Sequence, residues 1–362
     1  MRLRKVIGIP LTLITISLIW CGVLILREDM GKRVEIVSQD SLLNKTHATI
    51  LINTGSPENL SRTAVKQFIG DMLSDEHVMG MPNFIRVPLA RGIIAPFRAS
   101  SSLERYKLIW GEGLESPLLR HSRLLASSCQ ELLSEPVELS MRYGVPNITT
   151  TIKNINSRNL NLDSVTLFPL FPQFAVSSYH TAVADAVKRL EANGFDGKLY
   201  VVKPYYNHPA YIKCVAEGLR ESLEKGFDML LFSFHSLPLS QIEEGEARGM
   251  EYDYKFQCLE SARLIAQELG VSEDKYSVVW ASAIGNSWQR PYMDEVVASL
   301  PSQGVSRLVI TAPGFIVDNL ESLYDLGCEA KDIFLKSGGV SFEFAHCVNE
   351  SFAEAIVEIS RS

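Results

Sequence analysis

Short apolar runs that alternate with helical patterns are the feature that most constrains the fold of this chain. The runs have the length of buried strands, and the stretches between them carry apolar residues at helical spacing. The strand-like runs are Ala48–Asn53, Val137–Tyr143, Val165–Leu170, Leu199–Val202, Met229–Phe234, Tyr276–Ala281, Leu308–Thr311 and Phe342–Ala345. The helical patterns are at residues 60–73, 101–110, 118–133, 181–191, 211–224, 256–269 and 294–299. This alternation predicts an α/β protein with parallel sheets that are covered by helices on both faces.

A faint internal repeat indicates that the chain has two similar halves. The order strand, proline, apolar turn, polar residues and helix occurs in VTLFPLFPQFAVSSYHTAV and again in LVITAPGFIVDNLESLYDL. A length of 362 residues suits two domains of ordinary size. The repeat therefore predicts two α/β halves with a cleft between them, where ligands commonly bind.

One strand-like run ends in a histidine. The stretch MLLFSFHSLP, residues 229–238, begins as a buried strand and is broken after residue 233, which places His235 where the strand ends. The carboxyl ends of parallel strands form the crevice in which α/β proteins bind ligands. His235 is therefore a candidate functional residue, and the alternative is a buried histidine with satisfied hydrogen bonds.

A second candidate site follows the strand at residues 308–311, where a helix is expected to begin near Asp318. Glu321, Asp325 and Glu329 recur every four residues and form an acidic row on one face of that helix. Like charges at this spacing destabilise a helix, which favours a functional reason for the row. Two alternatives stay open, because Asp318 and Glu321 have the spacing of a capping box and the row could be a solvated face.

The composition excludes several classes of function. The formal net charge is −7 and no basic cluster interleaves with aromatic residues, so nucleic acid is not an expected partner. The six cysteines lie far apart without a Cys-x-x-Cys pair, which argues against a zinc ribbon, an iron–sulfur cluster or a disulfide scaffold and for a reducing compartment. The sequence has no glycine-rich phosphate loop and no serine nucleophile elbow, so nucleotide use has no support.

Two apolar stretches raise the question of a membrane. Val6 to Leu26 contains no charge and is long enough to cross a bilayer, so we expect a helical anchor and keep residues 1–45 outside the fold. The alternative is a start codon placed upstream of a soluble enzyme. Val78 to Phe97 is rich in Met, Phe, Ile and Pro without a clean helical period. It is expected to line a pocket or to touch a membrane surface, and the alternative is an irregular piece of core.

Eight motifs occur in one order along most of the chain, from about Ala48 to Glu358. They are LINTGSP, YKLIW followed by GLESPLL, MRYGVPNI, LFPLFPQFAVSS, LLFSFHSLP, QC in the helix after it, WQRPYMDE and APGFIVDNLESLYDL. Together they resemble the ferrochelatase family, whose members insert ferrous iron into a porphyrin late in haem synthesis. FSFHSLP with the downstream PGF and LESLY is the most specific part.

The resemblance implies two similar Rossmann-like domains, class II chelatase-like, with parallel four-stranded sheets that face one another across a cleft. The domains would span residues 46–178 and 179–335, with residues 336–362 packing back on the first. His235 and Glu321 would be catalytic and would bind the metal across the cleft. The acidic row would continue through Asp325 and Glu329 as a route for metal or protons.

The resemblance also implies a porphyrin site. The residues that would lie near the porphyrin are Arg98, Arg142, Tyr143 and Trp288. Met81 to Phe97 would form an apolar lip at the mouth of the cavity. For each arginine the alternative is a surface or interdomain salt bridge.

The implied reaction explains why these residue types would be needed. Two pyrrole protons leave as the metal enters, and a neutral imidazole beside the ring suits their removal. Fe²⁺ is a substrate here, no organic cofactor is expected, and a sparse His and Glu site can bind iron and release it. Tighter binding of the bent macrocycle than of the flat one lowers the barrier. The apolar lip favours protoporphyrin IX over coproporphyrin III.

The chain departs from the family pattern at several positions. Ala283 stands where a basic residue is more common, one residue fewer separates Gly285 from Trp288, and Asn319 stands where some members have a second histidine. The C-terminal cysteine cluster of some members is absent from the sequence. An N-terminal span is unusual in bacterial members, which leaves the location open. The catalytic domain is expected in the cytoplasm, with or without an anchor in the inner membrane through Val6 to Leu26.

Two other functions stay open from the sequence. One is a chelatase that acts on another tetrapyrrole or metal. The other is a non-catalytic haem-binding protein tethered by residues 6–26.

Overall fold

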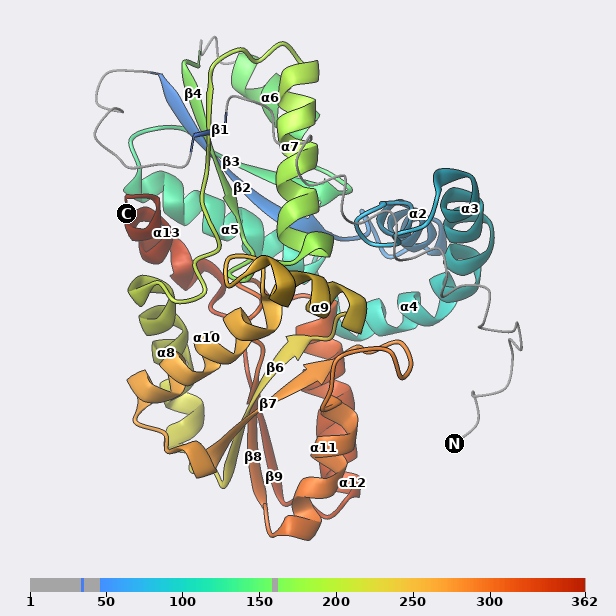
Figure 1. Cartoon of the computed structure of the whole chain (residues 1–362), viewed down its shortest axis with the longest axis vertical. Coiled ribbons are helices and arrows are strands. Elements are labelled where there is room, and N and C mark those ends of the chain that lie inside the picture. Colours follow the sequence, from blue (N-terminus) through green and yellow to red (C-terminus); the bar gives the residue numbers. More distant parts are fainter. Residues whose placement is uncertain (1–33, 36–45, 158–161, 362) are drawn as a thin grey trace.

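The structure is a computed structural model that describes residues 34–35, 46–157 and 162–361. These residues form two parallel sheets, each flanked by helices, in two lobes that lie one above the other in Figure 1. The expected apolar helix at residues 6–26 lies outside the described residues. Within the described ranges, no helix has both the length and the apolar character needed to cross a bilayer.

The first sheet has the strand order β1-β5-β4-β2-β3, and every neighbouring pair is parallel. Its strands are β1 (Val34–Glu35), β2 (His47–Gly55), β3 (Val137–Tyr143), β4 (Ser164–Pro169) and β5 (Lys198–Val201). Because β1 adds only two residues at the edge, the sheet is the expected four-stranded one with a short extension. The associated helices are α5 (Pro117–Leu132), α6 (Ile148–Ser157), η3 (Val176–His180) and α7 (Thr181–Ala192).

The second sheet has the order β7-β6-β8-β9 and is also entirely parallel. Its strands are β6 (Met229–His235), β7 (Tyr276–Ala281), β8 (Arg307–Thr311) and β9 (Ser341–Ala345). The larger helices of this half are α8 (Pro209–Glu224), α9 (Leu239–Arg248), α10 (Tyr254–Leu269), α11 (Met293–Ser299), the π-helix η6 (Glu321–Ala330) and α12 (Lys331–Lys336). Short 3₁₀ turns lie at η4 (Glu273–Lys275), η5 (Leu300–Gln303) and η7 (Asn349–Phe352), and the last helix is α13 (Ala353–Ser360).

The sheets extend past the domain limits expected from the sequence. Strand β5 belongs to the first sheet, which therefore reaches Val201 rather than residue 178, because α7 crosses the sheet face and returns the chain parallel to β4. Strand β9 belongs to the second sheet, which reaches Ala345 rather than residue 335. The C-terminal helix α13 does pack against α5 of the first half, and it also contacts α8.

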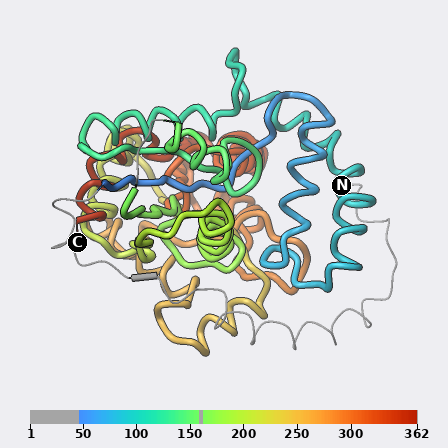
Figure 2. The backbone as a smooth tube through the Cα atoms, turned by 90° about the horizontal axis from the view of Figure 1, so that it is seen from above, coloured from blue at the N-terminus to red at the C-terminus, as the bar shows by residue number. Residues whose placement is uncertain are grey.

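A third group of helices stands to one side of both sheets, as Figure 2 shows in blue and cyan. It consists of α2 (Arg62–Leu73), α3 (Asn83–Pro88), η2 (Leu89–Ile94) and α4 (Ala95–Ile109). Much of the stretch Val78 to Phe97 is therefore helical rather than irregular. Its apolar side chains are not all core, because Phe84 is 78% exposed and Phe97 is 80% exposed.

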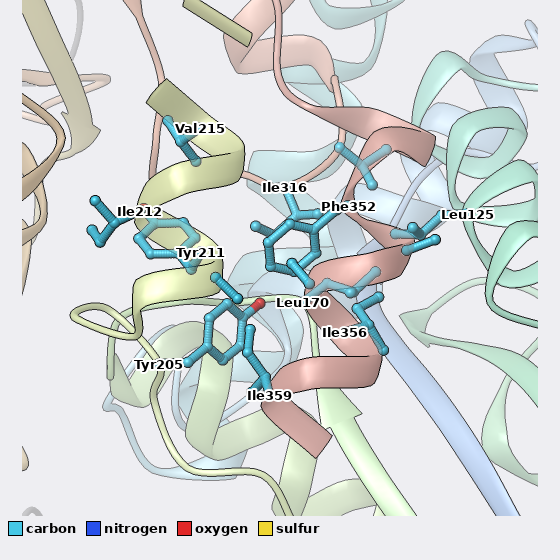
Figure 3. Close-up of a cluster of buried hydrophobic side chains, with 14 of the residues drawn as sticks. Leu125, Leu170, Tyr205, Tyr211, Ile212, Val215, Ile316, Phe352, Ile356 and Ile359 are labelled. Carbon is cyan, nitrogen blue, oxygen red and sulfur yellow. The ribbon is translucent and has the colours of Figure 1, made fainter. Parts of the chain in front are cut away.

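A shared hydrophobic core joins the two sheets and includes residues from β2, β3, β4, β6 and the flanking helices. Figure 3 shows Phe352, just before α13, between the rings of Tyr205 and Tyr211 and the aliphatic side chain of Leu125. Both Tyr211 and Phe352 are fully buried, and the Tyr211 hydroxyl donates to the carbonyl of Pro313 at 2.7 Å. The end of the chain therefore helps to fix one half of the protein on the other.

The glycine of the LINTGSP motif is required by close backbone packing. Gly55 ends β2 with φ of +101°, and a Cβ at this position would lie 1.8 Å from the carbonyl oxygen of Tyr143 in β3. A side chain would be strained by the dihedral angle and excluded by the neighbouring strand.

Candidate active site

His235 is the last residue of β6 and is partly buried. Its Nδ1 lies 2.6 Å from the carbonyl oxygen of Ser236. Since a carbonyl only accepts, Nδ1 carries the proton and the neutral ring keeps its lone pair on Nε2. Burial lowers the pKa of His235, and the bond to Ser236 and the negative charge of Asp325 oppose this effect. The imidazole is therefore neutral near pH 7 and suited to accept a proton.

Trp288 lies beside this imidazole. The ring centres of His235 and Trp288 are 6.3 Å apart and their planes are inclined by 57°. The loop that carries Trp288 is tied to the β6 loop, because Gln289 donates its backbone N–H to the carbonyl of Leu237 at 2.9 Å. The structure thus brings two of the residues singled out in the sequence into contact.

The acidic row lies on the π-helix η6, which begins at Glu321. The capping box expected between Asp318 and Glu321 is not formed. Instead Asn319 Oδ1 accepts the backbone N–H of Ser322 at 2.9 Å, and Ser322 Oγ accepts the backbone N–H of Asn319 at 3.0 Å. Asn319 and Ser322 therefore cap the start of η6 through these two hydrogen bonds.

Asp318 instead ties the start of η6 to the chain after β9. Its carboxylate accepts from Ser322 Oγ at 2.9 Å, His346 Nδ1 at 2.8 Å and Asn349 Nδ2 at 3.0 Å. Burial raises the pKa of Asp318, but the bonds from His346, Asn349 and Ser322 outweigh this and hold it below its ordinary value. A buried, ionised carboxylate thus fixes the helix that carries the acidic row.

Asp325 is the most buried member of the acidic row and is held through both oxygens. Ser282 Oγ donates to Oδ2 at 2.8 Å, and Arg105 Nη1 lies 3.5 Å from Oδ1. Burial, followed by the negative charge of Glu321, raises the pKa of Asp325 to about 6. A carboxylate with this pKa can both take up and release a proton near neutral pH.

Ser282 reaches Asp325 from an unusual backbone conformation. It follows β7 directly and has φ of +59°, in the left-handed region that non-glycine residues rarely adopt. Such strain concentrates at functional sites, where the surrounding structure compensates for it. Here the conformation accompanies the hydrogen bond to Asp325.

The acidic row runs from partly buried to exposed. Glu321 is partly buried and Glu329 is exposed. Burial raises the pKa of Glu321, and the charges of Arg98 and Arg105 on α4 act in the opposite direction. The row and the imidazole share one electrostatic environment, because Asp325 acts on His235 and Glu321 acts on Asp325.

Arg142 and Tyr143, expected near the porphyrin, belong to a separate cluster around Asp75. Arg142 Nη2 and the Tyr143 hydroxyl lie 2.5 Å and 2.7 Å from Asp75 Oδ2, and Thr181 Oγ1 donates to the same oxygen. Arg142 Nη1 also lies 3.3 Å from Asp185 Oδ1. The Arg142 guanidinium is therefore engaged in ion pairs within the first half of the protein, neither at the surface nor between the halves, and a propionate would have to compete for it.

Arg98 is placed differently, because its side chain is exposed on α4 and its charge acts on Glu321. Across the described residues, no group of three His, Cys, Asp or Glu side chains is arranged to hold a metal ion together.

Comparison with known proteins assigns the chain to a family. The ferrochelatase family model matches residues 46–362. A ferrochelatase of Vibrio cholerae serotype O1 is 32% identical over 312 residues, which cover 85% of this chain and 94% of the relative. One of Porphyromonas gingivalis is 30% identical over 318 residues, with coverage of 83% and 91%. The chain belongs to the ferrochelatase family.

Solved structures show that this ferrochelatase-family chain shares its fold with chelatases. The sirohydrochlorin chelatase SirB from Bacillus subtilis subspecies spizizenii, in complex with cobalt, matches with a TM-score of 0.52 at 10% identity. That match covers 87% of this chain and 94% of the other. SirB from Bacillus subtilis with Fe³⁺ matches with a TM-score of 0.50 at 12% identity, covering 87% and 95%. At such low identity the likeness concerns the fold alone.

Sequence reasoning missed two residues of this ferrochelatase-family site and misjudged the role of a third. Ser282 and Arg105 contact Asp325 from elements that are 43 and 220 positions away, and no local pattern marks either one. Asp318 was noticed, but only as a helix cap. The position of Ser282 directly after a strand was the one available signal, because strand ends in parallel sheets converge.

Removing the Ser282 hydroxyl should raise the pKa of Asp325 further. In Ser282→Ala the ionised carboxylate loses a donor, and a hydrogen bond to a charged group corresponds to about one pKa unit. Carboxyl ¹³C NMR of the labelled protein would measure the shift. Ser282→Gly loses the same hydroxyl without the left-handed strain and should shift the pKa equally. An unchanged pKa in both variants would contradict the assigned contact.

Proposed function

We propose that this protein inserts Fe²⁺ into a porphyrin to form haem, with release of the two pyrrole protons. Membership of the ferrochelatase family supports the reaction. The observation that carries the assignment to this site is the neutral, partly buried imidazole of His235 in one environment with the acidic row.

His235 has the role of base in this proposal. Its Nδ1 is occupied by the Ser236 carbonyl, so Nε2 is the atom that accepts a pyrrole proton. The lowered pKa keeps the ring unprotonated at neutral pH, and the proton adds to the free lone pair. Imidazole is also a ligand that ferrous iron accepts, so the same nitrogen can hold the metal transiently.

Glu321 has the role of the second acceptor and metal guide, and Asp325 and Glu329 continue the route. Glu321 carries the raised pKa of a buried acid, and Asp325, with its pKa of about 6, is suited to pass a proton on. Glu329 is exposed and can exchange with solvent. The protons thus have a path of carboxylates from the site to the surface.

The porphyrin would lie against Trp288, which stands beside His235. Arg98 is the better candidate for a propionate than Arg142, because Arg142 is already paired with Asp75 and Asp185. A planar guanidinium can bind a carboxylate through two hydrogen bonds. The apolar side chains of α3 to α4 favour protoporphyrin IX, the more hydrophobic of the two candidate porphyrins.

Replacing either proposed proton acceptor should abolish most of the activity. His235→Ala and Glu321→Gln should each lower kcat at least about 100-fold, the usual contribution of a positioned acid or base. Haem formation from Fe²⁺ and protoporphyrin IX under anaerobic conditions measures this. The control is Glu343→Gln, which removes a surface carboxylate paired with Lys225. Near wild-type rates in either active-site variant would contradict the roles.

The same assay separates the alternatives. A panel of coproporphyrin III and other tetrapyrroles, with Co²⁺ and Zn²⁺ beside Fe²⁺, would reveal a chelatase with another preference. Haem binding without iron insertion under every condition would indicate a non-catalytic haem-binding protein.

We also propose that the protein associates with a membrane surface through the apolar lip, Met81 to Phe97. Phe84, Ile85, Ile93 and Phe97 of this lip are exposed, and exposed apolar side chains gathered on one segment favour a binding surface. The charge-free stretch Val6 to Leu26 would add an anchor, with the catalytic part on the cytoplasmic side.

Co-sedimentation with phospholipid vesicles tests the lip. A chain lacking residues 1–45 should bind vesicles, and the double substitution Phe84→Ser, Phe97→Ser should reduce its binding by about tenfold, since the membrane affinity of such surfaces scales with buried apolar area. The control is Val340→Ser, which changes an exposed apolar residue next to β9. Equal binding of all three proteins would refute the lip as a membrane contact.

A further inference from the structure

Two arginines on α4 face the acidic row of η6. Arg98 and Arg105 are seven residues apart and so lie on one face of α4. Both act on Glu321, and Arg105 also lies 3.5 Å from Asp325 Oδ1. The guanidinium carbon of Arg105 is 4.9 Å from the centre of the Tyr324 ring. Arg105 therefore makes two separate contacts with η6.

Helix packing fixes Arg105 in this place. Leu320, directly before η6, packs against the cluster formed by Val65, Tyr106 and Trp110 on α2 and α4. Tyr106, the neighbour of Arg105, is buried. Burial, followed by the negative charge of Glu321, raises the pKa of Tyr106. The contact between the two helices thus places the partly exposed guanidinium of Arg105 beside the row.

Arg105 also completes the coordination of Asp325. One oxygen of this carboxylate accepts from Ser282 and the other faces Arg105. An arginine keeps its charge at every accessible pH, so it acts as a permanent counter-ion.

A row of carboxylates without a counter-ion would retain divalent metal. Glu321, Asp325 and Glu329 together can attract Fe²⁺, but iron that stays in the row is not delivered to the porphyrin. A fixed positive charge beside the row weakens this retention by electrostatic repulsion. Arg105 lies 3.5 Å from Asp325 Oδ1, so the effect acts on this member of the row.

We propose that Arg105 is a positioning residue for metal transfer, which holds Asp325 and keeps the acidic row from retaining the divalent ion. This inference rests on the proposed roles of Glu321 and Asp325 in iron insertion. It makes Arg105 a residue that sets metal affinity and not one that touches the reacting atoms.

Metal binding in the absence of porphyrin tests the proposal. Isothermal titration calorimetry at constant ionic strength measures Co²⁺ binding to the full chain. Arg105→Gln should bind Co²⁺ about three- to tenfold more tightly than the wild type, as expected for the loss of one partly exposed charge. The KM for Fe²⁺ in Arg105→Gln should fall in the same proportion, while kcat does not rise. Arg105→Lys keeps the charge and should restore wild-type affinity.

The matched control is Lys107→Gln, on the same helix. Lys107 pairs with Glu104, and both side chains are at least half exposed. Its loss removes the same charge from α4 and should leave Co²⁺ affinity unchanged. Equal affinities in wild type and Arg105→Gln, or the same change in Arg105→Lys, would overturn the proposal. The binding assay needs no porphyrin, so it tests the effect of Arg105 on metal affinity even if the wild type forms no haem. Failure of this proposal can therefore be distinguished from failure of the proposed function.

Discussion

The parallel pairing of β6 and β8 is the constraint on which the site depends. The two strands lie side by side in register, with Phe232 of β6 opposite Thr311 of β8. Both strands therefore end at one edge of the sheet. Strand β6 ends in His235, and β8 is followed by a short loop that leads into η6. Strand β7 lies on the other side of β6 and ends at the same edge, where Ser282 and the loop to Trp288 begin. Three strand ends thus supply the proposed base His235, the acidic row, and the Ser282 hydroxyl that donates to Asp325.

The ionised carboxylate of Asp325 at this edge reduces the stability of the fold. Asp325 has a pKa of about 6 against an ordinary value of 3.8, so its ionised form at pH 7 costs on the order of 3 kcal/mol of folding free energy. Because the folded pKa is the higher one, this cost grows as pH rises from about 4 to 6 and is complete above that range. A buried carboxylate whose pKa is raised in this way is typical of active sites.

The pKa of Asp75 is shifted in the opposite direction to that of Asp325. Burial raises its pKa, but the bonds from His77, Arg142, Thr181 and Tyr143 outweigh burial and hold the pKa well below 3.8. A carboxylate of this kind stabilises the fold above its unfolded pKa, and the contribution is lost as pH falls. Asp75 links the segment before the apolar lip to β3 and α7, which makes it a structural anchor rather than a site residue.

Much of the fold could be predicted from the sequence, because buried strands are local and strongly patterned. The bounds of β3 and β7 agree with their runs to the residue. Helix α6 was missed although Ile148, Ile152 and Ile155 recur at helical spacing along its ten residues, and α9 was missed because its short sequence is mostly polar. The roles of Arg142 and Arg105 depend on partners 67 and 220 positions away, which no local pattern reveals. His235 and the acidic row were found because strand ends and helix periodicity are visible in the sequence, and the family motifs pointed to the same residues.

The most direct test of the account is a crystal structure of the protein with metal-free porphyrin bound. The account predicts that the macrocycle lies at the edge where β6, β7 and β8 end, with His235 Nε2 within hydrogen-bond reach of a pyrrole nitrogen and the Glu321 carboxylate facing the ring. A porphyrin bound elsewhere, or a ring that contacts neither side chain, would contradict it.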